Sequence, residues 1–587
     1  MNKKEFTLLN ALNDISLNIE NSETEVLVMD ALNDKDLYEE CVSNSLIKES
    51  KITAKGLEEL EKYRVDNAII LAAGPATRFI PLSLEMPKGL YEVRGEPLIE
   101  RQIKQLHEVG IKDITVVLGY KQEMYYYLKE KYDVKFAFNN EFNIKNNIQS
   151  IYASRKELKN TYICNCDSYY TINPFHTYEY NSFCAGYYSS IKRKEAYVEI
   201  DEDRRITGMS FSKSEGNMLL GHSFWKEDFS NKLIEIVEND KEVGKYDREF
   251  WEWLVEDNLD VLPPIHFKEY KEGIIFEFDY FDELREFDEK YLGDTHSKIM
   301  NNITSVFNCG EEEVINFRNI DEGLTNTSII FAIDGVDYIY RHPGDGTESI
   351  INRANERTSL EKAKELGIDP TYIYMDIDEG WKISKYVPKF KEPDYVNFED
   401  SKRIIKVLRD LHASEVIVDY GLMPYEDACE IEKILKQKDK NSFNKFEGLK
   451  KDIHDLYESV KGDGVGKCFC HGDTYKHNWM LLDNGDVILI DWEYSGYSDP
   501  GIDVGYYIID AMYELEDAKR FIKEYLGNEY TTKLEYHYLA YSALIAYYWF
   551  VWAMYRESCG AIMGESLYNW YDMAKRYVKY ANDYKVE

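Results

Sequence analysis

Two loops suited to phosphate chemistry stand far apart in this chain. The first, at residues 71–78, reads Leu-Ala-Ala-Gly-Pro-Ala-Thr-Arg, and the second, at residues 471–478, reads His-Gly-Asp-Thr-Tyr-Lys-His-Asn. Each loop needs its own buried scaffold, and 587 residues exceed what a single hydrophobic core usually holds. The sequence therefore predicts an α/β chain of several domains, which we place at residues 1–65, 66–292 and 293–587.

The charge balance narrows the partners that the chain can bind. There are 71 Lys plus Arg residues against 108 Asp plus Glu residues, a formal net charge of −37. Nucleic acid and anionic lipid repel such a polyanion. We therefore expect small-molecule substrates and neither nucleic acid nor a membrane as partner, and the sequence leaves the oligomeric state open.

Cysteine usage and apolar segments favour a cytoplasmic protein. The nine cysteines show no C-x-x-C spacing, which is typical of reduced thiols, and residues 1–25 contain no apolar segment of signal-peptide length. Residues 538–555 run for eighteen positions without a charge, enough for a marginal membrane span, but five of them are tyrosines. We interpret this segment as a buried helix.

The first 65 residues read as short helices. Thr53 is suited to cap a helix that carries Leu57 and Leu60 on one face, an arrangement that resembles the end of a winged helix-turn-helix. Such modules bind DNA, but this segment has 8 basic and 14 acidic residues. Its recognition helix would carry four acidic residues: Asp34, Asp36, Glu39 and Glu40. We favour a regulatory or interaction role.

Residues 66–292 have the pattern of a doubly wound α/β sheet. The apolar segment 68–73 ends at Gly74, helical spacing follows at 98–109, and 114–118 is a second apolar segment. Short continuous apolar segments are typical of parallel strands that are buried on both faces. Such sheets bind ligands at the carboxyl ends of their strands, where the first loop would lie.

The residue types around this loop suit a nucleoside triphosphate and a metal ion. Backbone N–H groups at a strand-to-helix turn bind anions, Arg78 offers a forked cation, and Lys88 offers a point charge. Asp167 follows an apolar segment, and Glu277 and Asp279 share one face of a strand by its period of two. Three converging carboxylates would hold Mg²⁺. Taken alone, the last two could equally form a solvated strand face.

Residues 71–90 resemble the sugar-phosphate nucleotidyltransferase superfamily, through the spacing A-A-G-x-x-x-R-x-x-P-L-x-x-x-x-P-K-G-L. The likeness is greatest to bacterial CTP:phosphocholine cytidylyltransferases and extends to about residue 292. It implies a Rossmann-like domain that uses CTP and Mg²⁺ to convert phosphocholine into CDP-choline and pyrophosphate, without a covalent intermediate. It also implies that Lys88 is catalytic and that the Mg²⁺ ligands are Asp167, Glu277 and Asp279. The residues expected to contact the nucleotide are Ala73, Gly74, Arg78, Lys88 and Ser150.

One position departs from the superfamily pattern. Pro75 and Ala76 stand where a second glycine is frequent, and Pro75 removes a backbone donor, so the fit of the loop around a triphosphate stays open. A quaternary ammonium group is expected in an aromatic cage beside a carboxylate. Our candidates for this cage are Tyr169, Trp225, Asp247 and Trp251.

Residues 293–587 begin with features of a kinase-like small lobe. A polar loop carrying Asn326 and Thr327 joins two strand-like segments, and Arg341 ends the following strand. We expect these three residues to contact a nucleotide, together with Glu356, which lies in the helical segment 350–365 and would pair with Arg341. Taken alone, Arg341 could equally be a surface charge.

The second motif is the strongest signal in the sequence. His471-x-Asp473-x-x-x-x-Asn478, followed by Asp491-x-Glu493, offers a carboxylate for a hydroxyl proton, an amide, and metal-binding carboxylates. These residues resemble the choline kinase and aminoglycoside phosphotransferase family, over roughly residues 295–587. The resemblance implies a bilobal protein-kinase-like fold that uses ATP, with Asp473 as catalytic base. It implies Mg²⁺ ligation by Asn478, Asp491 and Glu493.

Trp549 and Trp552 resemble the W-x-x-W helix of choline kinases. Two tryptophans three residues apart share a helix face, and indole faces attract a trimethylammonium group, although the same face could be core. Trp492 is a further candidate for substrate binding. Asp410 and His412 are interpreted as a helix end despite a likeness to a protein-kinase loop.

Together the resemblances imply a bifunctional enzyme, a choline kinase joined to a choline-phosphate cytidylyltransferase. Two alternatives are open. The same reactions could use ethanolamine or an aminophosphonate, or the chain could be a regulatory protein that senses ligands and uses its N-terminal module as output. The retained acidic motifs argue against the regulatory alternative.

Overall fold

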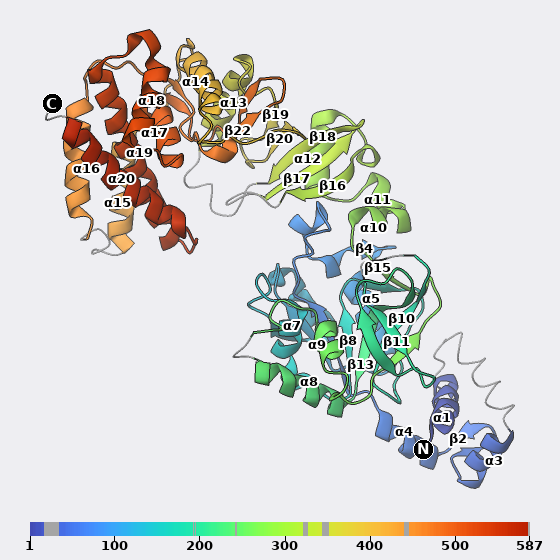
Figure 1. The fold of residues 1–587 in the computed structure, drawn as a ribbon. Coiled ribbons are helices and arrows are strands. Elements are labelled where there is room, and N and C mark those ends of the chain that lie inside the picture. Colours follow the sequence, from blue (N-terminus) through green and yellow to red (C-terminus); the bar gives the residue numbers. More distant parts are fainter. Residues whose placement is uncertain are drawn as a thin grey trace. The chain divides into compact units, whose positions relative to one another are not determined.

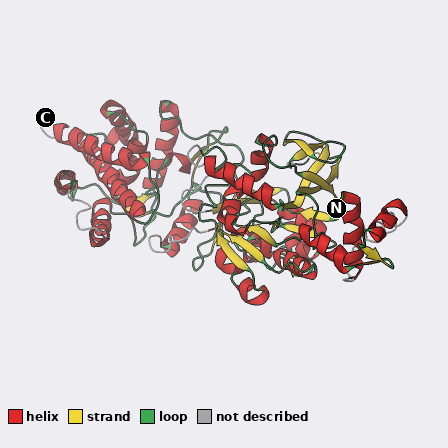
Figure 2. Ribbon diagram, turned by 90° about the horizontal axis from the view of Figure 1, so that it is seen from below, coloured by secondary structure: helices red, strands yellow, loops and turns green. Residues whose placement is uncertain are grey.

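The computed structural model describes residues 1–16, 35–191, 193, 195–240, 244–320, 327–342, 352–438 and 445–584. These residues form two compact units, Met1–Asn319 and Ile320–Glu587 (Figure 1). Helices and strands occur throughout the chain, as the predicted α/β class requires (Figure 2). The candidates Asp34 and Asn326 lie outside the described residues.

The N-terminal module consists of short helices and a hairpin. Thr53 caps its last helix, as predicted, by accepting a hydrogen bond from the backbone N–H of Gly56. Leu60 is buried, but Leu57 is 37% exposed, so the predicted shared apolar face is wrong for Leu57. The described elements are α1 (Lys3–Ser16), α3 (Lys35–Ser43), β1 (Ile47–Lys48), β2 (Lys51–Ile52) and α4 (Ala54–Leu60).

A nine-stranded mixed sheet forms the centre of the first unit. Its middle strands, β3 (Asn67–Ala72), β6 (Ile114–Leu118) and β8 (Thr161–Asn165), are parallel and almost wholly buried, which confirms the predicted buried parallel strands. The remaining strands are β7 (Lys135–Phe138), β10 (Phe183–Ser189), β11 (Tyr197–Ile200), β12 (Ile206–Ser210), β13 (Gly216–Trp225) and β14 (His266–Glu269).

Each face of this sheet has its own hydrophobic core. Ile70 and Val116 pack in the core that includes α5 (Leu98–Glu108), whereas the adjacent Ile69 and Val117 pack in the opposite core. Because side chains alternate along a strand, both faces of β3 and β6 must be apolar. The opposite core includes helices α7 (Asn147–Ala153), α8 (Glu227–Asp240) and α9 (Trp251–Asp257).

The chain beyond residue 292 remains packed on the first unit. Asn319 donates a hydrogen bond to the carbonyl oxygen of Thr77 at 2.6 Å, and Glu85 accepts one from the backbone N–H of Ile299 at 2.8 Å. The buried Arg285 donates to carbonyl oxygens near residue 311. The segment that leaves this unit is therefore tied to the loop that carries Arg78. Beyond residue 292 lie α12 (Lys298–Phe307) and β16 (Ile315–Ile320), and before it lie β9 (Ser168–Tyr170), β15 (Ile275–Glu277) and α10 (Phe281–Phe287).

The second unit begins with an antiparallel sheet and one helix. The strands β17 (Thr327–Ile333), β18 (Val336–His342), β20 (Lys382–Lys385) and β19 (Tyr372–Met375) lie side by side in that order. Helix α13 (Arg353–Glu365) carries Glu356 toward this sheet, because Glu356 pairs with Arg341 of β18. This part has the strand and helix content expected of a kinase small lobe.

Helices dominate the rest of the second unit. They are α14 (Phe398–His412), α15 (Pro424–Lys438), α16 (Glu447–Val460), α17 (Gly501–Asp510), α18 (Leu515–Leu526), α19 (Thr532–Ser558) and α20 (Glu565–Tyr584). The second motif lies among two short antiparallel strand pairs. These are β21 (Cys468–Cys470) with β24 (Gly496–Ser498), and β22 (Trp479–Leu481) with β23 (Val487–Leu489). Asp410 and His412 lie at the end of α14, as interpreted.

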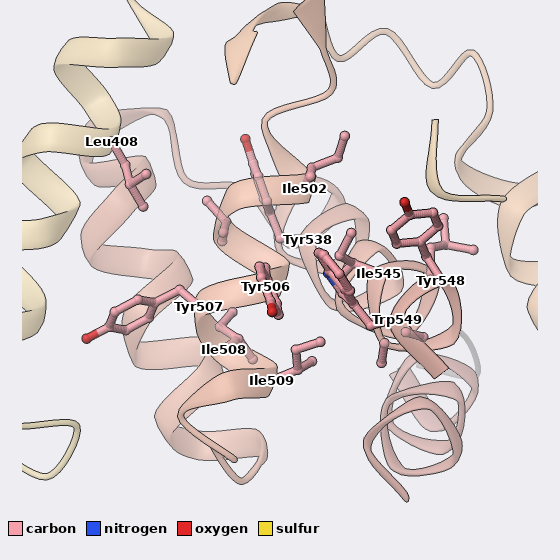
Figure 3. Packing of buried hydrophobic residues seen from close by; sticks show 14 of the residues in the cluster. Leu408, Ile502, Tyr506, Tyr507, Ile508, Ile509, Tyr538, Ile545, Tyr548 and Trp549 are labelled. Atoms are coloured by element: carbon pink, nitrogen blue, oxygen red, sulfur yellow. The ribbon is translucent and has the colours of Figure 1, made fainter. Parts of the chain in front are cut away.

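The uncharged segment 538–555 lies inside α19 and forms the core of the second unit. Tyr538, Ile545 and Trp549 pack against residues of α17, including Ile502 and Tyr506 (Figure 3). Burial against neighbouring helices explains why this helix lacks charges, and it confirms the predicted buried helix. Among the described helices, none combines the length and hydropathy needed to cross a membrane.

Candidate active sites

The first loop packs closely against the end of β6. A Cβ atom on Gly119 would lie 2.7 Å from the carbonyl oxygen of Ala73, so only glycine permits this approach. Ala76 adopts a left-handed backbone with φ of 48°, a conformation that favours glycine. The departure noted in the sequence therefore places alanine at a position whose backbone conformation favours glycine.

Lys88 is a buried cation at the centre of the first site. Its ammonium lies 2.6 Å from Oδ2 of Asp167 and 3.8 Å from Oδ1 of Asp279. Burial alone would lower the pKa of Lys88, but the surrounding carboxylates outweigh it and raise the pKa above its ordinary value. Lys88 therefore stays charged over the whole physiological range.

The structure brings the three predicted metal ligands together around Lys88. Glu277 ends β15 and Asp279 lies just beyond it, so the strand is shorter than predicted. Burial, followed by the charge of Asp167, raises the pKa of Glu277. Within the described chain, Oδ1 of Asp167 is buried without a hydrogen-bond partner. Crowded oxygen donors with unmet bonding capacity fit a divalent cation such as Mg²⁺.

A cavity of about 900 Å³ opens above these carboxylates. It is large enough for a nucleotide and a small second substrate. Candidate residues from the sequence that line it are Ala73, Gly74, Arg78, Lys88, Ser150, Asp167, Trp251, Glu277 and Asp279.

Three residues proposed for the ammonium cage lie outside this cavity lining. Trp225 is fully buried in the core, where its ring packs on Trp251 with centroids 5.1 Å apart. Tyr169 is also buried, and the Arg101 guanidinium lies 4.6 Å from its ring centroid. Asp247 lies at the surface, 3.4 Å from the ammonium of Lys145. Tertiary packing therefore overturns these three assignments.

The cavity has an acidic, aromatic wall that the sequence did not reveal. Phe211, Phe250, Glu195 and Glu252 line it beside Trp251. Burial raises the pKa of Glu252 to about 7 and, with the nearby carboxylates, that of Glu195 to about 8. In the sequence, the only indication that Glu252 lies at this site was its position next to the candidate Trp251.

Backbone hydrogen bonds hold this wall in place. The side-chain oxygen of Asn147 accepts a hydrogen bond from the backbone N–H of Trp251 at 2.8 Å, and the N–H of Asn146 donates to the carbonyl of Asp247 at 3.0 Å. The start of α9, which carries Trp251, is thereby fixed against the start of α7.

The second site is built on the loop after β21. Asp503 accepts hydrogen bonds from the backbone N–H groups of His471 and Gly472 at 2.8 and 2.7 Å, and it contacts the imidazole of His412 at 2.9 Å. Burial favours the neutral form of Asp503, but His412 and these donors hold its pKa below the ordinary value. Asp503, which the sequence did not single out, therefore anchors the loop that presents Asp473.

Asp473 has the environment of a general base. The amide of Asn478 donates to Oδ2 of Asp473 at 3.2 Å, while Oδ1 has no hydrogen-bond partner among the described residues. Burial, supplemented by the charge of Asp491, raises the pKa of Asp473 to about 8. A carboxylate of raised basicity with one open oxygen can accept a proton from a hydroxyl group.

Three cations and three carboxylates form a network beside this base. Arg341 lies 2.6 Å from Glu356, which is the ion pair expected from the sequence, and 3.2 Å from Asp491. Oxygen atoms of Glu356, Asp491 and Glu493 all lie within 4.8 Å of one another, a spacing that suits a metal ion. The predicted ligand Asn478 donates its amide N–H to Asp473, which leaves its amide oxygen, the atom a metal would bind, outside that bond. Thr327 is exposed at the start of β17. Sequence reasoning missed the other two cations of the network, Arg353 and Lys382.

An aromatic cluster adjoins Asp473. The ring of Trp549 stacks on Tyr506 with centroids 5.1 Å apart and meets Tyr494 and Trp552 edge-on, both at 5.2 Å. Figure 3 shows Tyr506 and Trp549 facing each other between α17 and α19. Tyr506 also lies close enough to Asp473 to influence its pKa. Trp549 and Tyr506 are themselves buried, at 3% exposure each, in the core of the second unit, whereas Trp552 at the edge of the cluster is partly exposed.

Trp492 does not belong to this cluster. It is fully buried, it stacks on Phe469 with centroids 5.8 Å apart, and its indole N–H donates to the carbonyl of Leu489. Its assignment to substrate binding is therefore wrong, because its ring is enclosed by the core beneath the loop.

The two sites define a class of protein, a nucleotidyltransferase unit and a kinase-like unit on one chain. Residues 68–174 match the MobA-like NTP transferase domain family, and residues 317–583 match the choline/ethanolamine kinase family.

Individual relatives narrow the class of the first unit. The chain is 33% identical to choline-phosphate cytidylyltransferase from Streptococcus pneumoniae over 226 residues, which is 38% of this chain and 96% of that protein. It is 31% identical to 2-aminoethylphosphonate cytidylyltransferase from Lancefieldella rimae over 233 residues, which is 38% of this chain and 93% of that protein. Through its first unit, the chain belongs to the family of these cytidylyltransferases.

The second unit is similar to a solved kinase structure. Choline kinase LicA from Streptococcus pneumoniae is 24% identical, with a TM-score of 0.43, and the match covers 48% of this chain and 98% of that one. The chain therefore joins a cytidylyltransferase domain to a segment that matches the choline/ethanolamine kinase family model over residues 317–583.

Proposed function

We propose that the chain is a bifunctional enzyme acting on choline in two steps. The second unit transfers the terminal phosphoryl group of ATP to choline, and the first unit transfers CMP from CTP to the resulting phosphocholine, giving CDP-choline and pyrophosphate. Both families act on nucleotides, and the product of one reaction is the substrate of the other. ATP and CTP are cytoplasmic metabolites, so we place both reactions in the cytoplasm.

The observation that carries this proposal is the position of Tyr506. This residue influences the pKa of Asp473 on one side and stacks on Trp549 on the other. An alcohol whose cationic end rests among electron-rich rings would therefore present its hydroxyl group near the base. Choline has this combination of a hydroxyl and a quaternary ammonium group.

In the kinase reaction, Asp473 accepts the hydroxyl proton as the alcohol oxygen bonds to the γ-phosphorus and the bond to ADP breaks. Arg341 holds Glu356 and Asp491 in place and offers positive charge to the phosphates. Asp491 and Glu493 would hold Mg²⁺, which supplies neutralisation of the phosphate charge when it is bound.

In the cytidylyltransferase reaction, a phosphate oxygen of phosphocholine attacks the α-phosphorus of CTP and pyrophosphate leaves. Lys88 provides a buried positive charge for the phosphoryl group, so positioning and electrostatics do most of the catalysis. Asp167, Glu277 and Asp279 would hold Mg²⁺, which supplies further charge neutralisation. Glu252, beside Trp251, is placed to face the ammonium end.

The relationship to a 2-aminoethylphosphonate cytidylyltransferase supports a second candidate substrate for the first unit. That compound already carries phosphorus, so it would need no kinase before cytidylyl transfer. A kinase domain on the same chain therefore favours an alcohol as the starting substrate. Between choline and ethanolamine, the aromatic cluster around Trp549 favours the quaternary amine.

The test is ³¹P NMR of the purified chain with Mg²⁺, ATP, CTP and choline. We expect CDP-choline from the wild type, phosphocholine alone from Asp167→Ala, and neither product from Asp473→Ala. Parallel reactions use ethanolamine, and 2-aminoethylphosphonate with CTP only. Reaction of ethanolamine but not choline would overturn the substrate, and no reaction with any of the three would overturn the proposed chemistry.

A further inference from the structure

Lys382 occupies an unusual place in the small lobe of the second unit. It is the first residue of β20, and the strand register puts it directly opposite Arg341 of β18. Opposed residues on antiparallel strands project from the same face of a sheet. Both side chains are strongly buried, with exposed fractions of 8% for Arg341 and 10% for Lys382. Two buried cations therefore lie side by side on one face of this sheet.

The carboxylates near Lys382 already have closer partners. Glu356 receives Arg341 at 2.6 Å on one oxygen and Arg353 at 2.8 Å on the other. Asp491 receives Arg341 at 3.2 Å. The negative charge of Glu356 is thus matched without Lys382, and burial of a third cation costs free energy that these contacts do not require.

The distances of Lys382 show that its bonding capacity is not used by these carboxylates. Its ammonium lies 3.6 Å from Oε1 of Glu356 and 3.8 Å from Oδ1 of Asp491. Both contacts exceed the 2.7 to 3.2 Å typical of a hydrogen bond. An ammonium group has three donors in a freely rotating head, which suits the oxygen atoms of a phosphate.

We infer that Lys382 is a second phosphate-binding cation of the kinase unit, which contacts the nucleotide's phosphate oxygens while Arg341 remains paired with Glu356. The inference rests on the proposed use of ATP by this unit. It assigns the two opposed cations different tasks: Arg341 fixes the carboxylates and adds positive charge near the phosphates, and Lys382 makes direct contact with the phosphate oxygens. Phosphates would replace the long carboxylate contacts with charge-assisted hydrogen bonds.

The test compares the binding of ATP with that of adenosine, because only ATP has phosphates. The full chain is titrated by calorimetry with each ligand in Mg²⁺, without choline and with saturating CTP to fill the first unit. For Lys382→Met we expect the Kd for ATP to rise about tenfold or more and the Kd for adenosine to stay unchanged. Lys382→Arg should retain most of the affinity, because it keeps the charge.

Lys385→Met is the matched control, since this lysine is exposed at the other end of the same strand. It should bind both ligands as the wild type does. Equal weakening of ATP and adenosine by Lys382→Met would show a purely structural role and overturn the inference, as would unchanged ATP affinity. If the wild type binds ATP but phosphorylates no alcohol, the proposed kinase activity is wrong. The comparison of ATP with adenosine still tests the role of Lys382 in that case. A wild type that binds no ATP would overturn both.

Discussion

Both sites contain a cluster of carboxylates, but the two clusters differ in how many buried cations surround them. In the first site Lys88 is the one buried cation among the described lining residues, and it faces Asp167, Glu277 and Asp279. In the second site Glu356, Asp491 and Glu493 are interleaved with Arg341, Arg353 and Lys382. The first site therefore carries excess negative charge by itself, whereas in the second the cations balance Glu356 but not every carboxylate, because burial and then the charge of Asp491 raise the pKa of Glu493 to about 8.

This difference explains the opposite behaviour of two acids. Glu277 of the first site has a pKa raised by burial and by neighbouring carboxylates. Glu356 is more deeply buried, at 1% exposure, yet its cationic neighbours overcome the burial cost and lower its pKa to about 2. The first site depends on charges brought by substrates and metal, while the second is organised before they bind.

The comparison predicts that the lone cation matters most. Lys88→Met should lower the rate of CDP-choline formation by roughly 10²- to 10³-fold, because no second buried cation among the described lining residues replaces its charge and Arg78 is half exposed. Choline phosphorylation by the same protein should be unchanged. Both rates can be followed by ³¹P NMR, with Lys104→Met, an exposed lysine of α5, as control. An equal fall in both rates would indicate misfolding and contradict the separate roles of the two sites.

Removal of one cation from the second site should have a smaller effect. Arg341→Met leaves Glu356 paired with Arg353 and near Lys382, so we expect choline phosphorylation to fall by roughly 10- to 100-fold. Steady-state kinetics with varied ATP measure the loss, and Arg341→Lys should restore part of it. A loss as large as that of Lys88→Met would break the distinction between lone and shared cations.

The aromatic cluster of the second unit should affect selectivity more than rate. Trp549→Phe should reduce the preference for choline over ethanolamine about tenfold in kcat/KM, since a smaller ring binds a quaternary ammonium group less well. The KM for ATP should stay constant. Trp552→Phe, at the more exposed edge of the cluster, should have a weaker effect. An unchanged preference in both variants would reduce the cluster to core packing.

Much of this architecture could be predicted because the decisive signals are local. The segment 68–73 is apolar without interruption and ends in glycine, so its burial on both faces follows from composition and length. Asp473 and Asn478 were found for the same reason, since their spacing within one loop is visible in the sequence. The pairing of Arg341 with Glu356 is likewise present.

The residues that were missed or misassigned depend on packing between distant segments. Glu252 and Lys382 reach their sites only through the folded arrangement of helix and strand, and neither belongs to a short motif. Trp225 and Trp492 were assigned to substrate sites although both are enclosed by core. A tryptophan in a cage and one in a core have the same appearance in sequence, because both need apolar neighbours.

The fourth prediction concerns stability and uses Glu252. Its folded pKa of about 7 exceeds the ordinary value of 4.5, so the folded state holds this proton more tightly than the unfolded state does. Stability is therefore lost as pH rises from about 4.5 to 7, by at most about 3 kcal/mol. Glu252→Gln should melt a few degrees higher than the wild type at pH 8 and at the same temperature near pH 4.5, in thermal scans of the first unit's transition.

His537 provides the matched test in the second unit, where an ion pair compensates burial. Burial lowers the pKa of His537, but Asp499 and Asp463, at 3.0 and 2.8 Å, outweigh it and raise the pKa. This pairing stabilises the folded state fully below the unfolded pKa near 6.5 and is lost as pH rises through the folded pKa. His537→Asn should therefore lower the melting temperature most at pH 6 and less at pH 9. If the difference in melting temperature between His537→Asn and the wild type stays constant across this pH range, His537 acts by packing. If Glu252→Gln is no more stable than the wild type at pH 8, the Glu252 carboxylate bears no cost of burial.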